Sequence, residues 1–385
     1  MSMDISFKLD PEIIIGPDTL SLAGSICGRY GRRVMIAADH ALETRHVKRL
    51  QDILEDSGIS VIVFDGVEEN SSVEMAENIV ELCCAAHCSA VVGFGGRKAM
   101  TIARMAAYMS PLRLSVFDLF DRSQTRNQFL PFIAIPTSGM DAFMFTEYFA
   151  VVDPRDRLVK SVSTPHGMFA AAIVDSNLSN LLTDSSAALS LFEGFGAAAE
   201  AYCSAKANFL SDALLERSLS MYAKLIKFDP SHAASGGIDQ EMSAQANFAA
   251  ALGISLSSPG IAAALPLAVN SRCPSAAKPQ IAAALLPFLA ERLAASRPEK
   301  MARIASFLGG SDSLDATTAD AAGSAAETIR RSMETLGVKT SLKDYNIPLD
   351  MLMAAVESAR NLEFVSNSPW IVSEETIFEI LKQII

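Results

Sequence analysis

Gly-Phe-Gly-Gly-Arg-Lys, at residues 93–98, is the stretch that decides the fold. Its first two residues end a short apolar run, residues 89–94, that is typical of a buried strand. The residues after the glycines open a segment that we expect to be helical. A glycine-rich turn between a strand and a helix lets backbone N–H groups and the helix dipole meet a pyrophosphate. Gly95, Gly96 and Lys98 are therefore candidate dinucleotide-binding residues. The pattern is neither a Walker motif nor GxGxxG, so a glycine-rich turn without a ligand stays open as the alternative.

Similar apolar runs, rich in β-branched residues, alternate with amphipathic stretches through the first half of the chain. The sequence predicts strands at residues 33–38, 60–64 and 131–135 as well, and an amphipathic helix at residues 73–84. This alternation indicates parallel strands joined by crossover helices. We therefore predict an α/β, Rossmann-like domain with a parallel sheet.

Asp39 directly follows the first of these strands, at an edge where open α/β sheets place their ligands. A carboxylate there accepts hydrogen bonds from both ribose hydroxyls of an adenosine and repels a 2′-phosphate. If Asp39 binds a dinucleotide, NAD is thus favoured over NADP. The alternative is that Asp39 caps a helix that starts at His40, since Asp is a favoured N-cap residue.

The loop that follows the strand at residues 131–135 reads Pro-Thr-Ser-Gly-Met-Asp. Its two hydroxyls and its carboxylate, from Thr137, Ser138 and Asp141, are further candidates for lining a nucleotide or substrate site. A solvated turn explains the same residues.

After about residue 178 the composition shifts to Ala, Leu and Ser with helical spacing. We predict an α/β dinucleotide-binding domain at residues 1–178 and an all-helical domain at residues 179–385. Breaks between helices are expected at Asp229-Pro230, Gly236-Gly237, Pro274, Pro279 and Gly309-Gly310.

Residues 242–271 carry no formal charge and are long enough to cross a bilayer. The stretch is broken by Ser-Ser-Pro-Gly at residues 257–260, and lipid-facing backbone does not tolerate an unpaired turn. The sequence therefore predicts two buried helices rather than a membrane span.

The formal net charge is -12, and no Lys/Arg-rich run occurs, so nucleic acid is not an expected partner. Charged residues near the N-terminus stand where a secretory signal needs an apolar core, which predicts a cytoplasmic protein. The cysteines at residues 83–88 lack the ligand spacing and the second ligand pair of a zinc site, and we interpret them as packing residues.

Taken in order, these pieces resemble the iron-containing alcohol dehydrogenase superfamily, which includes glycerol dehydrogenases and is related to dehydroquinate synthases. The similarity is carried by the glycine loop at residues 91–104, the loop at 136–146, the strand at 172–175 and Glu-Ala-Tyr at 200–202. The resemblance implies a parallel-sheet domain followed by an all-helical domain, with a cleft between them. It also implies a dinucleotide, a divalent metal held by one Asp and three His, and hydride transfer. By the same resemblance, residues 5–15 pair across a two-fold axis in a homodimer.

The ligand positions that the resemblance implies hold Glu193, Ala197, a residue near Leu256, and Lys278. No histidine occurs after His232. A catalytic metal needs several ligands and an open position, so we expect no tightly bound iron or zinc. Lys278 brings a positive charge to this region, and a surface lysine between helices is the alternative.

The dinucleotide loops differ from the family as well. Arg97 and Lys98 replace a glycine and a serine, while Thr101 and Arg104 replace an aspartate and a lysine. Large side chains at residues 140–144 would narrow the part of the dinucleotide site that holds the nicotinamide. The cations gained at Arg97 and Lys98 favour binding of the pyrophosphate.

Two functions remain open. The first is a metal-independent NAD(P)-linked alcohol or aldehyde oxidoreductase, in which a donor such as Lys278 or Lys160 polarises the substrate carbonyl. The second is a catalytically inactive relative that binds a nucleotide, an anionic metabolite or a protein partner.

Overall fold

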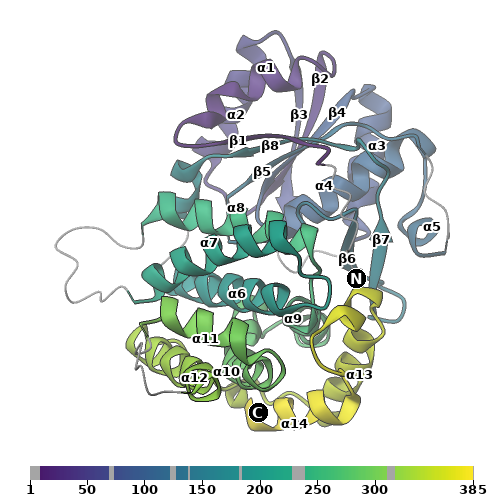
Figure 1. The fold of residues 1–385 in the computed structure, drawn as a ribbon. Helices are drawn as coiled ribbons and strands as arrows, with labels where there is room; N and C mark the ends of the chain where they lie inside the picture. The colour runs from purple at the N-terminus through teal and green to yellow at the C-terminus, as the bar shows by residue number, and fades with distance from the viewer. Residues whose placement is uncertain are drawn as a thin grey trace. The chain divides into compact units, whose positions relative to one another are not determined.

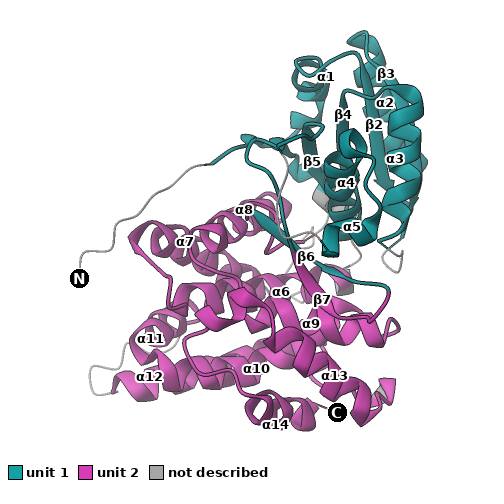
Figure 2. Cartoon of the chain, turned by 90° about the vertical axis from the view of Figure 1, so that its right-hand side faces the viewer, with its two compact units in different colours: residues 1–138, 147–154, 162–181 teal, residues 139–146, 155–161, 182–385 magenta. Residues whose placement is uncertain are grey.

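The computed structural model describes residues 9–68, 73–121, 127–137, 139–181, 184–227, 239–309 and 317–384. The chain forms two compact units (Figure 2). Unit 1 comprises residues 1–138, 147–154 and 162–181, and unit 2 comprises residues 139–146, 155–161 and 182–385. Because two short segments of unit 2 lie within the first half of the sequence, the chain passes between the units several times.

Unit 1 is built on a six-stranded parallel sheet with the order β1-β8-β5-β4-β2-β3. Its strands are β1 (Glu12–Ile15), β2 (Arg33–Asp39), β3 (Ser60–Val67), β4 (Ala90–Gly95), β5 (Phe132–Pro136) and β8 (Phe169–Val174). The four predicted strands are confirmed as β2 to β5, with small differences at their ends. Of the N-terminal segment expected to pair across a two-fold axis, residues 5–8 lie outside the described residues.

Helices cover both faces of this sheet, with α1 and α2 on one side and α3 and α4 on the other (Figure 1). The unit contains α1 (Ala23–Cys27), α2 (Thr44–Asp56), α3 (Met75–Ala86), α4 (Arg97–Met109), α5 (Val116–Asp121) and the 3₁₀ turns η1 (Thr19–Leu22), η2 (Ser110–Leu112) and η3 (Ser176–Leu181). The helix predicted at residues 73–84 is confirmed as α3.

The alternation of side chains along the strands explains the two layers. Ile36 and Phe94 point to the face where Leu50 and Leu54 of α2 complete a buried cluster. On the opposite face, a Cβ added to Gly93 would lie 3.1 Å from the Ala103 Cβ atom, so the glycine lets α4 pack closely on β4.

The strand order places a switch in chain direction between β2 and β4. From β2 the chain moves outward to β3 and then returns to form β4 on the other side of β2. In open α/β sheets, ligands bind at such a point, outside the carboxyl ends of the strands. The sheet therefore puts the end of β2 and the glycine turn after β4 at a favoured ligand-binding edge.

A second, two-stranded sheet is formed by β6 (Tyr148–Val152) and β7 (Val159–Ser163). The described parts of residues 184–384 are helical and contain no strand. The helices are α6 (Asp184–Cys203), α7 (Phe209–Ile226), α8 (Gln240–Leu256), α9 (Ile261–Arg272), α10 (Lys278–Ser296), α11 (Pro298–Phe307), α12 (Thr318–Thr335), α13 (Leu349–Arg360) and α14 (Glu374–Ile384), with η5 (Lys343–Tyr345) and η6 (Glu363–Asn367).

Of the five expected helix breaks, two lie where the sequence placed them, one lies inside a helix and two cannot be compared. Pro274 separates α9 from α10, and Gly309 follows the end of α11. Pro279 instead lies in the first turn of α10, because a missing N–H costs nothing at that position. The breaks expected at residues 229–230 and 236–237 lie outside the described residues.

The uncharged stretch at residues 242–271 forms α8 and α9, with the break at the predicted place. The two helices are bent by 104° relative to one another. Most of α9 is buried, as expected for a core helix. Among the described helices, none is by itself long and apolar enough to cross a membrane, although this bent pair together meets the length and composition criteria.

Candidate functional site

Asp39 ends β2 and links two parts of the ligand-binding edge of unit 1. Its Oδ1 atom accepts a hydrogen bond from the Ala41 N–H at 3.0 Å, and its Oδ2 atom accepts one from the Gly96 N–H at 3.3 Å. The next helix, α2, begins at Thr44 with Glu43 as its N-cap residue. The interpretation of Asp39 as the cap of a helix starting at His40 is therefore wrong, because the chain first makes a turn here.

Gly95 and Gly96 allow the close approach of this turn to Asp39. Gly95 has φ +143°, and a Cβ atom at this position would lie 2.4 Å from the Asp39 Cβ atom. Gly96 is extended, with φ −79° and ψ −177°, and is the N-cap residue of α4. The helix N-terminus, with its partial positive charge, thus begins at the carboxyl edge of the sheet.

The structure brings only part of the predicted set to this edge. Thr137 is buried and donates its backbone N–H to the Gly95 carbonyl at 2.9 Å, which places it beside the glycine turn. Lys98 is half-buried in the first turn of α4. Asp141 belongs to unit 2, where its carboxylate accepts a hydrogen bond from the Phe143 N–H at 3.0 Å. Ser138 lies outside the described residues.

Arg104, farther along α4, is a feature of unit 1 whose surroundings the sequence did not indicate. Its side chain is buried, and its guanidinium carbon lies 5.5 to 5.7 Å from the centroids of Phe132, Phe149 and Phe169. Cation–π attraction therefore stabilises α4 against these aromatic rings.

In unit 2, Glu193 of α6 and Lys278 at the start of α10 form a buried ion pair. Only 12% of the Glu193 side chain and 7% of the Lys278 side chain are exposed. The interpretation of Lys278 as a surface lysine is therefore wrong, because the packing of α10 against α6 encloses its side chain. Lys160, the other candidate donor, forms a more exposed ion pair with Asp156, with an N–O distance of 3.1 Å.

Glu200, two turns after Glu193 on α6, holds the N-terminus of α9. Its carboxylate accepts hydrogen bonds from the N–H groups of Ile261 at 3.0 Å and Ala262 at 2.7 Å. The Ser368 hydroxyl donates a third at 3.2 Å. Burial raises the pKa of the Glu200 carboxyl to about 6, and these hydrogen bonds partly oppose that rise.

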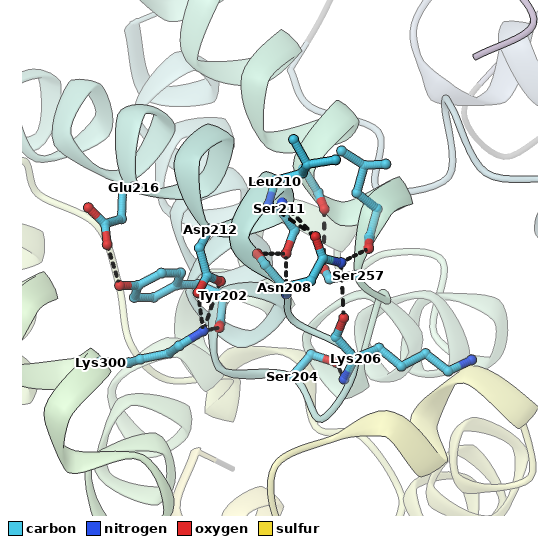
Figure 3. A network of polar contacts seen from close by, with 12 residues as sticks. Tyr202, Ser204, Lys206, Asn208, Leu210, Ser211, Asp212, Glu216, Ser257 and Lys300 are labelled. Atoms are coloured by element: carbon cyan, nitrogen blue, oxygen red, sulfur yellow. Dashed lines mark hydrogen bonds and ion pairs between the residues drawn. The ribbon is translucent and has the colours of Figure 1, made fainter. Parts of the chain in front are cut away.

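A further polar network follows the end of α6 (Figure 3). The Tyr202 hydroxyl donates to Glu216 at 2.6 Å, while the Lys300 ammonium donates to both oxygens of Asp212 at 2.8 and 2.9 Å. Burial, and then the contact with Glu216, raise the pKa of Tyr202. These contacts join α6, α7 and α11 structurally.

Comparison with known proteins gives the family. The profile described as "Iron-containing alcohol dehydrogenase" matches residues 10–176, and the profile described as "Fe-containing alcohol dehydrogenase family, C-terminal" matches residues 190–385. The chain belongs to the iron-containing alcohol dehydrogenase family. The predicted architecture, a parallel-sheet domain followed by a helical region, is confirmed as that of the family.

Similar members of this family act on several small molecules. The chain is 24% identical to a 1,3-propanediol dehydrogenase of Citrobacter freundii over 395 residues, covering 100% of both proteins. It is 26% identical over 305 residues to a choline dehydrogenase of Bacillus subtilis, covering 78% of this chain and 74% of that protein.

Solved structures of the family share the fold. A 1,3-propanediol oxidoreductase matches with a TM-score of 0.90 and 21% identity, covering 100% of both chains. A sulfoacetaldehyde reductase from Bifidobacterium kashiwanohense, solved with NAD+, matches with a TM-score of 0.83 and 18% identity, covering 100% of this chain and 99% of that one.

The residues of this chain suit a dinucleotide better than they suit a transition-metal ion. At the edge of unit 1, a carboxylate, a glycine turn without room for a Cβ atom and a helix N-terminus suit the adenosine and pyrophosphate of a dinucleotide.

The donor set in unit 2 does not suit a transition metal. An ammonium group such as that of Lys278 has no lone pair to offer, and the side chain of Ala197 carries no donor atom. In the described ranges, no three His, Cys, Asp or Glu side chains gather as a metal site would require.

Proposed function

We propose that this chain is an NAD-linked oxidoreductase that interconverts small alcohols and aldehydes without a bound transition metal. The observation that carries the proposal is the hydrogen bond between the Gly96 N–H and the Asp39 carboxylate at the sheet's switch point. It holds a ribose-binding acceptor beside a phosphate-binding turn, which is the arrangement that a dinucleotide needs. We place the adenosine ribose at Asp39 and the pyrophosphate at Gly95, Gly96 and Lys98.

The negative charge of Asp39 supports NAD rather than NADP as the cofactor. Two of its hydrogen bonds are made to backbone N–H groups, and a carboxylate has about four acceptor sites, so acceptor capacity remains for a ribose hydroxyl. A 2′-phosphate at the same place would meet like charge.

The substrate class follows from the names of the relatives. These proteins are named for 1,3-propanediol, choline and sulfoacetaldehyde, each a small alcohol or aldehyde. We extend this class, and no particular member of it, to the present chain. We also propose a cytoplasmic homodimer, with neither nucleic acid nor a membrane as its partner.

An inactive, ligand-binding relative is the second candidate, and the loop at residues 139–146 favours it. Met140, Phe143 and Met144 are buried in unit 2 rather than small or polar. The Phe143 ring packs against Phe364 with the centroids 5.4 Å apart. This loop would then serve packing, and the chain would bind a nucleotide, an anionic metabolite or a protein partner without hydride transfer.

Turnover measured after metal removal separates the two candidates. Protein dialysed against EDTA is assayed for NAD reduction with 1,3-propanediol and choline, and for NADH oxidation with sulfoacetaldehyde and a series of short aliphatic aldehydes. We expect turnover with at least one substrate and no gain on adding iron or zinc. Binding of NADH without any turnover would establish the second candidate instead.

A further inference from the structure

Cys83 and Cys88 lie at the two ends of the turn that closes α3. The Cys88 N–H donates to the Cys83 carbonyl at 2.9 Å, and the His87 N–H donates to the Cys84 carbonyl at 3.3 Å. His87 has the left-handed conformation, with φ 52° and ψ 51°. This is a Schellman motif, in which the side chains at the positions of Cys83 and Cys88 often come into contact. Here the Cys83 thiol donates a hydrogen bond to the Cys88 sulfur.

The surroundings of this pair make Cys88 the more reactive thiol. The Arg33 guanidinium donates to the Ala86 carbonyl, which holds a positive charge at the turn, and the Ser89 N–H donates to the Arg33 carbonyl at 2.8 Å. The hydrogen bond from Cys83, and then the charge of Arg33, lower the pKa of the Cys88 thiol against the effect of its burial. Contact with Cys88 and burial raise the pKa of Cys83. Cys88 is 8% exposed and Cys83 only 2%, so Cys88 is the sulfur that a small oxidant meets first.

The other cysteines have different surroundings. Cys27 and Cys203 are buried, and burial raises the pKa of each thiol to about 12. The Cys84 thiol donates to the Ser110 carbonyl at 3.4 Å. Cys273 is half-buried and belongs to unit 2. Cys84 is therefore a close control for the pair, and Cys273 is a control for an accessible thiol.

We propose that Cys83 and Cys88 form a modification site in unit 1 that hydrogen peroxide converts to a disulfide and that thiols restore. The Cys88 thiolate attacks one peroxide oxygen, the O–O bond breaks, and the departing hydroxide takes up the thiol's proton as water. The Cys83 sulfur then attacks the Cys88 sulfenic acid, so that the S–S bond forms and the S–O bond breaks. The hydroxyl leaves with the Cys83 proton as a second water. In sum, two thiols are oxidised and one peroxide is reduced to two waters, independently of the proposed oxidoreductase activity.

The test treats full-length protein with a small excess of hydrogen peroxide, which catalase then removes. Free thiols are blocked with iodoacetamide under denaturing conditions, and thiols released by dithiothreitol are labelled with N-ethylmaleimide. A peptide of residues 82–97, released by trypsin and a glutamate-specific protease, contains Cys83, Cys84 and Cys88 for mass spectrometry. Cys83→Ser and Cys88→Ser each remove one member of the pair, and Cys84→Ser is the matched control. Circular dichroism checks that each variant is folded.

We expect wild type to lose two of its six free thiols, with N-ethylmaleimide on Cys83 and Cys88 and iodoacetamide on Cys84. Cys88→Ser should leave Cys83 reduced. Cys83→Ser lacks the second thiol and should accumulate a sulfenic acid on Cys88 that dimedone traps, whereas Cys84→Ser should behave as wild type. Six free thiols remaining in treated wild type, a disulfide that includes Cys84, or oxidation of Cys273 before Cys88 would overturn the inference. Oxidation of Cys83 in Cys88→Ser to the same extent as in wild type would overturn it as well.

Discussion

Removing one partner of the Glu193–Lys278 pair is expected to destabilise unit 2 more than removing both. Both side chains are nearly buried, at 12% and 7% exposed, so solvent screens the remaining charge poorly. Leaving a buried charge without its partner costs about 3–5 kcal/mol, whereas replacing both members with apolar side chains of similar volume is often neutral. We therefore expect Glu193→Met and Lys278→Met each to lower the free energy of unfolding by about 3–5 kcal/mol. The double variant should lose less than either single variant.

Urea denaturation followed by tryptophan fluorescence is the assay for this cycle. The chain has a single tryptophan, Trp370, and it lies in unit 2 with both members of the pair. Its signal therefore reports on the unit that the substitutions perturb, even if the two units unfold separately. This expectation is refuted if either single variant loses less than about 1 kcal/mol of unfolding free energy, which is the range of exposed ion pairs. It is also refuted if the losses of the two single variants simply add in the double variant.

Three other perturbations test separate parts of the structure. Gly95→Ala should destabilise unit 1 and abolish NAD binding, because the added Cβ atom would lie 2.4 Å from the Asp39 Cβ atom. NAD binding to this variant that equals that of wild type in calorimetric titration would contradict this. The pKa of the Glu200 carboxyl is raised to about 6 in the folded protein, so the folded state binds the proton more tightly than the unfolded state does. This contribution to the free energy of unfolding is therefore present at low pH and is lost as the pH rises through 6. The stability advantage of wild type over Glu200→Gln should thus fall by about 1.5 kcal/mol between pH 4.5 and 6.5 in urea titrations, and a difference that does not change with pH would refute this. Asn208→Ala, which removes the capping box of α7, should lower the free energy of unfolding by about 1 kcal/mol in the same urea titration. An unchanged free energy of unfolding would contradict this.

The sheet could be predicted from the sequence because its information is local. Buried parallel strands are short apolar runs, and the runs at residues 33–38 and 131–135 stand between clear helical patterns. The glycine turn after β4 was also visible, since Gly95 needs a backbone conformation that other residues rarely adopt.

The candidate site in unit 2 could be predicted only in part, because its contacts join distant residues. Glu193 and Lys278 are 85 positions apart, and nothing in the local pattern at Lys278 shows that α10 buries it against α6. The three rings around Arg104 likewise come from separate strands. The alternative interpretation of Asp39 as a helix cap was wrong for a local reason, since a turn at residues 40–43 delays α2.

Calorimetric titration of NAD and NADP into wild-type protein and Asp39→Asn tests the central claim most directly. The substitution keeps one side-chain oxygen, which can accept from either the Gly96 or the Ala41 N–H group, and removes the negative charge. We predict that wild type binds NAD at least about 10-fold more tightly than NADP, and that Asp39→Asn weakens NAD binding about 10-fold and narrows the preference. No binding of either dinucleotide to wild type at millimolar concentration, or equal binding of both, would contradict the account.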